Sequence, residues 1–211
     1  HDVVELGDGL DEAMRTLEGL LGTSDRIRGV GETGLDFYWV KDGCGRDAQR
    51  AAFAAHIGWA KAHGLALVIH DRDAHEPLAD VLDAEGWPDR VQMHCFSGDA
   101  AFARRCLDHG AYLSFPGTVT FRANDDLREA ARLTPRDRIL VETDAPYLTP
   151  APVRGRPNAS YLMPHTVRFL ADLRGEPLDE FCAALDANAT GLFGDWGAGA
   201  EDAAGDRGSD G

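Results

Sequence analysis

The sequence predicts an α/β fold built on a parallel sheet, in the class of TIM-type (β/α) barrels. Short apolar runs alternate along the chain with segments of helical spacing, and this alternation is typical of βαβ units. The runs are apolar on both faces, as expected of strands that are covered by helices. The P-loop pattern G-x-x-x-x-G-K-[ST], one of the usual nucleotide signatures of open parallel sheets, does not occur, and a barrel is favoured.

The pattern divides into five strands and seven helices. The strands are predicted at 27–32, 65–70, 90–95, 111–115 and 138–143. The helices are predicted at about 9–22, 47–64, 73–85, 99–109, 125–132, 160–174 and 177–186. We expect Gly64 to be the C-cap of the second helix. One domain is expected over 1–193, followed over 194–211 by an acidic tail rich in Gly, Ala and Asp, which is typical of disorder.

Composition limits the classes of function. The 211 residues carry a net charge of −15, which argues against broad, non-specific binding to duplex DNA. A negative net charge is compatible with an enzyme that holds phosphates through metal ions. The four cysteines form no C-x-x-C pair, which favours a reduced, cytoplasmic protein. No run of 18 apolar residues occurs, so no membrane-spanning helix is expected.

Side chains that bind metals stand where four of the predicted strands end. The four are Glu32, His70, His94 and Asp144. In a barrel these ends converge at one mouth, where reactive residues lie. Two imidazoles and two carboxylates can hold a divalent ion, and two or three more ligands would allow a pair of ions that activates water. Glu142 is predicted either to stand behind Asp144 or to pair with Arg138.

Each of the four also has an ordinary structural interpretation. A lone histidine at a strand end is more often a hydrogen-bonded core residue, which applies to His70 and His94. Glu32 could belong to a turn, and Asp144 could cap the turn at Pro146. Four strand ends that all carry metal-ligand types favour a site over four separate coincidences.

Residues near these ends are candidates for binding substrate. Arg72 could bind a phosphate or pair with a neighbouring aspartate, and Ser97 could donate to an anion or begin a helix. Arg154 lies in a Pro/Gly-punctuated loop over 151–160 that could grip an anionic substrate or simply connect two elements. The aromatic run 37–39 could stack on a base or pack locally.

Five blocks of the chain resemble successive blocks of the TatD family of metal-dependent deoxyribonucleases. They are GVGETGLDFYW, VIHDRDAHE, MHCFSGD, YLSFPGTVTF and ILVETDAPYLTPAPVRGRPN, and they occur in order between about Ile27 and Phe193. The resemblance implies a barrel of the amidohydrolase superfamily. It also implies hydrolysis of DNA phosphodiester bonds from the 3′ ends of single strands, with divalent ions, two in number and of Mg²⁺, Mn²⁺ or Zn²⁺.

Carried over block by block, the resemblance assigns roles to the same four residues. Glu32 would bind or bridge the ions and, with Asp144, would be catalytic. His70, His94 and Asp144 would be ligands, and Asp144 would also orient or deprotonate the attacking water. Asn158 stands in PNAS, where the family usually reads NEP, and is carried over as a residue of the substrate loop.

One departure from the family pattern concerns the beginning of the chain. The family starts with a strand that ends in an H-x-H pair, and no such pair precedes Glu32 here. We therefore expect a barrel that lacks about two N-terminal strands and has a weakened metal site. A metal-dependent hydrolase of another ester or amide and a non-catalytic remnant are the alternatives to a nuclease.

Overall fold

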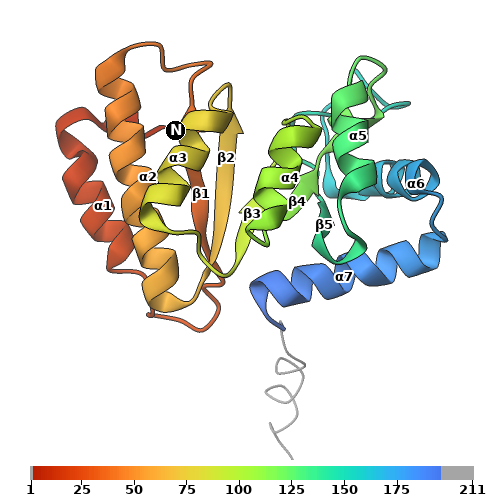
Figure 1. The fold of residues 1–211 in the computed structure, drawn as a ribbon. Coiled ribbons are helices and arrows are strands. Elements are labelled where there is room, and N and C mark those ends of the chain that lie inside the picture. The colour runs from red at the N-terminus through yellow and green to blue at the C-terminus, as the bar shows by residue number, and fades with distance from the viewer. Residues whose placement is uncertain (1, 196–211) are drawn as a thin grey trace, which may run out of the picture.

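The computed structural model describes residues 2–195 and shows one parallel sheet with helices packed against it (Figure 1). The strands lie in the order β1-β2-β3-β4-β5, so each pairs with its neighbours in sequence. Their bounds are Gly29–Asp36 (β1), Ala66–Arg72 (β2), Val91–Met93 (β3), Tyr112–Phe115 (β4) and Ile139–Val141 (β5). This order is that of successive β/α units in a TIM-type barrel, and the predicted fold class is confirmed.

The sheet is open along two edges. A closed barrel of this class has eight strands, whereas the described residues contribute five, with β1 and β5 at the edges. All five predicted strands are present. The first is longer than predicted, because β1 continues beyond Glu32 to Asp36. Its pairing with β2 is irregular between Val30 and Thr33 and resumes where Thr33 lies opposite Ile69, which places Gly34 opposite His70.

Each predicted helix is present in the described residues, with shifted bounds. They are Leu10–Glu18 (α1), Gly43–His63 (α2), His75–Glu85 (α3), Ala100–Asp108 (α4), Asp125–Leu133 (α5), Met163–Arg174 (α6) and Leu178–Phe193 (α7). Helix α2 begins after Asp42, whose carboxylate accepts a hydrogen bond from the Gly45 N–H at 2.7 Å. It ends at Gly64, which has φ 60° and is the predicted C-cap.

The two faces of the sheet bury different residues. Strand residues such as Leu67, Leu113 and Ile139 belong to the main core, together with apolar residues of α2 to α6. Their neighbours in sequence, Ala66 and Leu140, point to the opposite face and form a second cluster. We call this opposite face the inner face, because it corresponds to the interior of a barrel.

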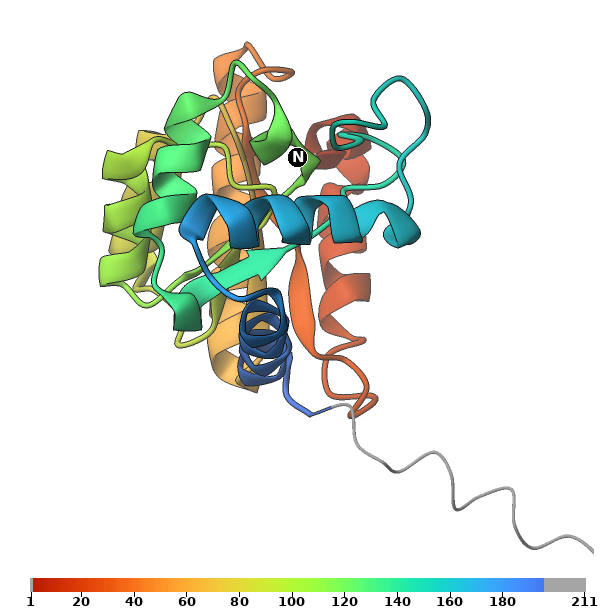
Figure 2. The same cartoon turned by 90° about the vertical axis from the view of Figure 1, so that its right-hand side faces the viewer.

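Helix α7 covers the inner face at the amino ends of the strands. Phe181 of α7 is part of the main core, whereas Leu192 packs with the inner-face cluster, so the helix reaches around the β5 edge. Figure 2 shows α7 nearly end-on, below α6. The helix extends to Phe193 rather than ending at 186, because its last turn packs against the sheet.

Two sequence predictions concern the ends of the chain and membranes. The acidic tail predicted over 194–211 lies, from residue 196 onward, outside the described residues. Within residues 2–195, every helix is too short or too polar to cross a bilayer.

Candidate metal centre at the strand ends

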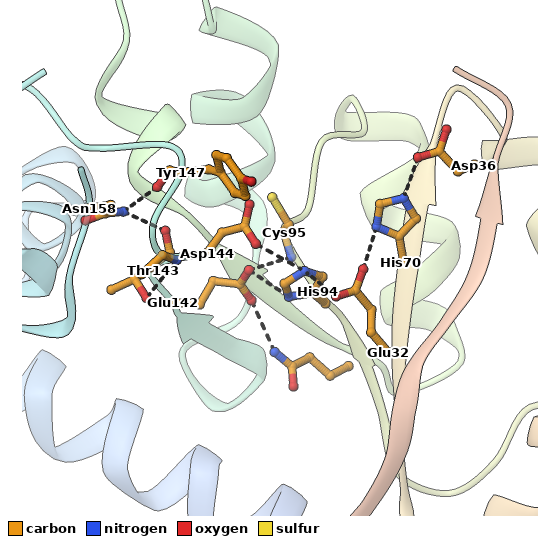
Figure 3. Close-up of polar contacts among 12 residues, drawn as sticks. Glu32, Asp36, His70, His94, Cys95, Glu142, Thr143, Asp144, Tyr147 and Asn158 are labelled. Atoms are coloured by element: carbon orange, nitrogen blue, oxygen red, sulfur yellow. Dashed lines mark hydrogen bonds and ion pairs between the residues drawn. The ribbon is translucent and has the colours of Figure 1, made fainter. Parts of the chain in front are cut away.

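Strand β1, strand β2 and the residue that follows β3 bring three of the predicted ligands together. One donor atom each from Glu32, His70 and His94 lies within 4.8 Å of the other two (Figure 3). Asp144 follows β5 and approaches the same group, with its Oδ1 3.8 Å from His94 Nε2. Four side chains that are distant in sequence therefore meet at one end of the sheet, as predicted.

The imidazole of His70 lies between two carboxylates. Its Nδ1 is 2.8 Å from Oε1 of Glu32, and its Nε2 is 3.0 Å from Oδ2 of Asp36. Asp36 is only 1% exposed. A buried carboxylate on one ring nitrogen fixes the orientation of the ring and directs the other nitrogen toward the centre of the site.

His94 repeats this arrangement with a different carboxylate. Its Nδ1 is 2.8 Å from Oε1 of Glu142, and its Nε2 is 3.5 Å from Oε2 of Glu32. Glu142 also accepts hydrogen bonds from the Cys95 N–H at 2.9 Å and from the Gln92 amide at 3.3 Å. The contacts of Glu142 are therefore with His94 and its neighbours rather than with Arg138, and it orients His94 rather than Asp144.

The loop after β5 holds Asp144 in a position open to solvent. The Asp144 side chain is 33% exposed, and its backbone has φ 54°. The buried Asn158 amide donates to the carbonyl oxygens of Thr143 and Tyr147, each at 2.7 Å, on both sides of Asp144. The loop is therefore fixed by hydrogen bonds while its carboxylate stays accessible.

The charges of the site act on one another. The hydrogen bond from His70 lowers the pKa of Glu32 against the opposing effect of burial, and the positive charge of His94 lowers it further. Burial lowers the pKa of His94, but the hydrogen bond to Glu142 and the surrounding carboxylates outweigh it and raise this pKa above its ordinary value. Burial also raises the pKa of Asp144.

The donor set fits a divalent cation. It combines two imidazoles with four carboxylates, namely Glu32, Asp36, Glu142 and Asp144. Even if both imidazoles carry a positive charge, four negative charges against two leave a net charge of −2. A divalent ion would balance this charge and bind the types of ligand that are present.

The four residues predicted to bind substrate have different surroundings. Arg72 is exposed and lies over the Tyr38 ring rather than pairing with Asp71 or Asp73, and Arg154 lies over the Phe121 ring. Ser97 is exposed between β3 and α4, and Asp99, not Ser97, caps α4. Asn158 is 5% exposed with its amide bound to the backbone, so it supports the loop of Asp144.

Two side chains of the polar network around the site were missed from the sequence. Asp36 was missed because β1 was expected to end four residues earlier. Its place in GETGLD, on alternate positions with Glu32 and Gly34, is the signal that could have found it. Gln92, which binds Glu142, carries no comparable local signal.

Comparison with known proteins agrees with this site. Residues 3–194 match the family model described as TatD related DNase. A metal-dependent hydrolase of *Mycobacterium tuberculosis*, TatD, is 49% identical over 190 residues, which cover 89% of this chain and 72% of that protein. The protein named 3′-5′ ssDNA/RNA exonuclease TatD of *Citrobacter rodentium* is 35% identical over 202 residues, 92% of this chain and 74% of that protein.

A solved structure gives the same result for the fold. The crystal structure of YjjV, a TatD homologue from *Escherichia coli*, superposes with a TM-score of 0.80 at 27% identity, covering 90% of this chain and 80% of that one. The chain spans 65% of the length of another *E. coli* relative, the metal-dependent hydrolase YcfH. With its sheet order, its strand-end ligands and these similarities, the chain belongs to the TatD family of metal-dependent hydrolases.

Proposed function

We propose that this protein hydrolyses phosphodiester bonds at the ends of single-stranded DNA. The observation that carries the proposal is the pair of imidazoles, each with one nitrogen bound to an outer carboxylate and the other directed at Glu32. Such preorganised ligands suit a metal-dependent hydrolase. The *C. rodentium* relative, named as an exonuclease of single-stranded DNA and RNA, supports nucleic acid as the substrate.

The proposed ligands are Glu32, His70, His94 and Asp144. Glu32 directs Oε1 toward His70 and Oε2 toward His94, so each of its oxygens could serve a different ion. Glu32 would therefore help to hold both ions if two are bound. The mixture of nitrogen and oxygen donors suits Zn²⁺ and Mn²⁺, and Mg²⁺ would rely on the carboxylates and the substrate phosphate.

The residues of the site would have different roles in hydrolysis. When bound, a divalent ion lowers the pKa of water and stabilises charge on a phosphoryl oxygen. Asp144 is the accessible carboxylate beside His94, and we assign it the role of accepting the proton of the attacking water. Asp36 and Glu142 do not contact substrate in this proposal; they position the imidazoles of His70 and His94.

The test is the shortening of a 5′-labelled single-stranded oligonucleotide. The wild-type chain and Asp144→Asn are compared with Mg²⁺, Mn²⁺ or Zn²⁺ and with chelator. We expect stepwise shortening that chelator abolishes and that Asp144→Asn slows by about 10²- to 10⁴-fold, the usual contribution of a general base. Asp137→Asn is the matched control, because this exposed carboxylate pairs with Arg138 before β5, away from the site.

Two results would contradict the proposal. One is shortening that persists in chelator or in Asp144→Asn. The other is no shortening with any of the three metals while a simple carboxylic ester or amide is hydrolysed in an Asp144-dependent reaction, which would assign the site to another bond.

A further inference from the structure

The turn after β1 exposes two aromatic side chains beside each other. Tyr38 is 44% exposed and Trp39 is 68% exposed, and their rings meet edge to face with centroids 4.9 Å apart. Phe37, in the same run, behaves differently: it is 7% exposed and belongs to the main core. Local packing therefore accounts for Phe37 but not for Tyr38 and Trp39.

These aromatic residues are tied to the metal centre through one carboxylate. Asp36 Oδ1 accepts a hydrogen bond from the backbone N–H of Trp39 at 2.8 Å, and Asp36 Oδ2 lies 3.0 Å from Nε2 of His70. Arg72 belongs to the same region, because its carbonyl oxygen accepts from the Phe37 N–H at 2.9 Å. Arg72 follows His70 by two residues in β2, so both point to the inner face, about 7 Å apart along the strand.

Positive charge gathers around the aromatic pair. The Arg72 guanidinium lies 3.9 Å from the centre of the Tyr38 ring, and the Lys41 ammonium lies 5.4 Å from it. Arg46 lies over the neighbouring Phe37 ring at 4.2 Å. Within the described part of the chain, none of these three cations has a carboxylate within 4.0 Å.

This cluster of positive charge contrasts with the overall charge of the molecule. The chain carries a net charge of −15, and other arginines, such as Arg105, contact acids. Exposed aromatic rings beside cations that lack acidic partners are the features with which proteins bind single-stranded nucleic acid without reading its sequence: bases stack on the rings and phosphates contact the cations.

We propose that Tyr38, Trp39 and Arg72, with Lys41 and Arg46 at the rim, form a subsite that binds one nucleotide of a single-stranded substrate. A base stacks on the indole of Trp39, and Arg72 contacts a phosphate while it supports the Tyr38 ring. The subsite would help to bind the substrate of the proposed nuclease, and the inference rests on that proposed function. Because stacking needs an unpaired base, it favours single strands over duplex DNA.

The test measures binding separately from hydrolysis. Affinity for a fluorescein-labelled 12-nucleotide single strand of about equal base composition is measured by anisotropy in chelator, for the full chain and its variants. Trp39→Ala should raise Kd by about 5- to 150-fold, the range for loss of one stacked base, whereas Trp39→Phe should stay within about threefold of wild type. Arg72→Gln should lower the slope of log K against log salt by about 0.7.

Trp87→Ala is the matched control. Trp87 lies between α3 and β3, at the amino ends of the strands, where its indole stacks on His109. This variant should bind the oligonucleotide as the wild type does. Circular dichroism melting of every variant shows whether it is folded, and Trp39→Phe distinguishes loss of stacking from loss of the side chain's shape.

A series of modified oligonucleotides tests the same contact by changing the nucleic acid instead of the protein. Each nucleotide in turn is replaced by an abasic residue. At one position the replacement should weaken binding to the wild type but not weaken binding to Trp39→Ala further, because the partner of the missing base is already absent. The position identifies the nucleotide that occupies the subsite.

The outcomes separate this inference from the proposed function. Equal Kd values for wild type and Trp39→Ala, or no binding by the wild type, overturn the subsite whether or not the enzyme cleaves DNA. Loss of binding in Trp39→Ala supports it even if no metal sustains cleavage, in which case the proposed hydrolysis fails alone. Equal weakening by Trp87→Ala would also overturn it.

Discussion

Each imidazole of the metal centre has an assigned partner on both ring nitrogens. His70 lies between Glu32 and Asp36, and His94 lies between Glu32 and Glu142. The outer carboxylates decide which nitrogen faces the centre. The ordinary interpretation of these histidines, as hydrogen-bonded core residues, accounts for the outer nitrogen of each ring, whereas the inner nitrogen faces Glu32.

Replacement of an outer carboxylate should weaken metal binding without removing a ligand. Asp36→Asn keeps the size of the side chain and its acceptor for the Trp39 N–H, but it removes the charge that orients His70. We expect the apparent Kd for Zn²⁺ or Mn²⁺ to rise by about 10- to 100-fold. Isothermal titration calorimetry of the metal-free protein measures this.

Asp47→Asn is the control for this titration. Asp47 is an exposed carboxylate in α2 that pairs with Arg50, so it has the same chemistry without contact to a ligand. Its variant should bind metal as the wild type does. If Asp36→Asn binds metal equally well, the orienting role assigned to Asp36 is wrong.

At the scale of elements, the β1–β2 pair determines where two of the proposed ligands, Glu32 and His70, lie. Gly34 has φ 142° and lies opposite His70, and a Cβ at this position would lie 2.0 Å from the His70 carbonyl oxygen. Only glycine allows this close approach with this backbone conformation. The pairing therefore holds Glu32 and His70 at the same level of the sheet.

Gly34→Ala should separate these strands. We expect a loss of about 3 kcal/mol or more in the free energy of unfolding, because backbone strain and overpacking add. Gly58→Ala is the opposite control: Gly58 is exposed within α2 and has open space around it, so alanine should stabilise the helix by about 0.5–1 kcal/mol. Urea unfolding followed by circular dichroism measures both, and equal effects would refute the role of Gly34.

The loop after β5 is a second element that positions a ligand. Asn158 joins the backbone on both sides of Asp144, at Thr143 and Tyr147. Glu142, the first residue after β5, binds His94. One short segment thus supplies a proposed ligand and the carboxylate that orients another.

At the scale of the whole molecule, the inner face of the sheet has an apolar and a polar end. Ala66 and Leu140 lie at the amino ends of their strands, under the last turn of α7. His70 and Glu142 follow them on the same face by alternation, at the carboxyl ends. Helix α7 covers the apolar end, and the candidate metal centre lies at the other.

Loss of the buried Leu192 side chain from the last turn of α7 should therefore destabilise the whole fold. Leu192 is fully buried against the inner face, so Leu192→Ala should lower the free energy of unfolding by about 2–5 kcal/mol. Leu178, at the start of the same helix, is 41% exposed, and Leu178→Ala should cost less than about 1 kcal/mol. Chemical denaturation measures the difference, and equal costs would show that α7 does not close this face.

The sequence by itself determined the elements and the proposed ligands. Alternation of apolar runs with helical segments is a local pattern, so five strands and seven helices could be located within a few residues, except for the end of α7, which was placed at 186 instead of 193. The residue type at each strand end is also local, and in a parallel sheet these ends meet at one edge. Glu32, His70, His94 and Asp144 could therefore be selected before their contacts were known.

Only the tertiary structure decided how these residues are held. Asp36 meets His70 across 34 positions in sequence, and Glu142 meets His94 from another strand. Such pairs depend on strand register and on the irregularity in β1, which no local pattern specifies. For the same reason the structure, and not the sequence, showed that Asn158 supports a loop and that Trp39 is joined through Asp36 to the metal centre.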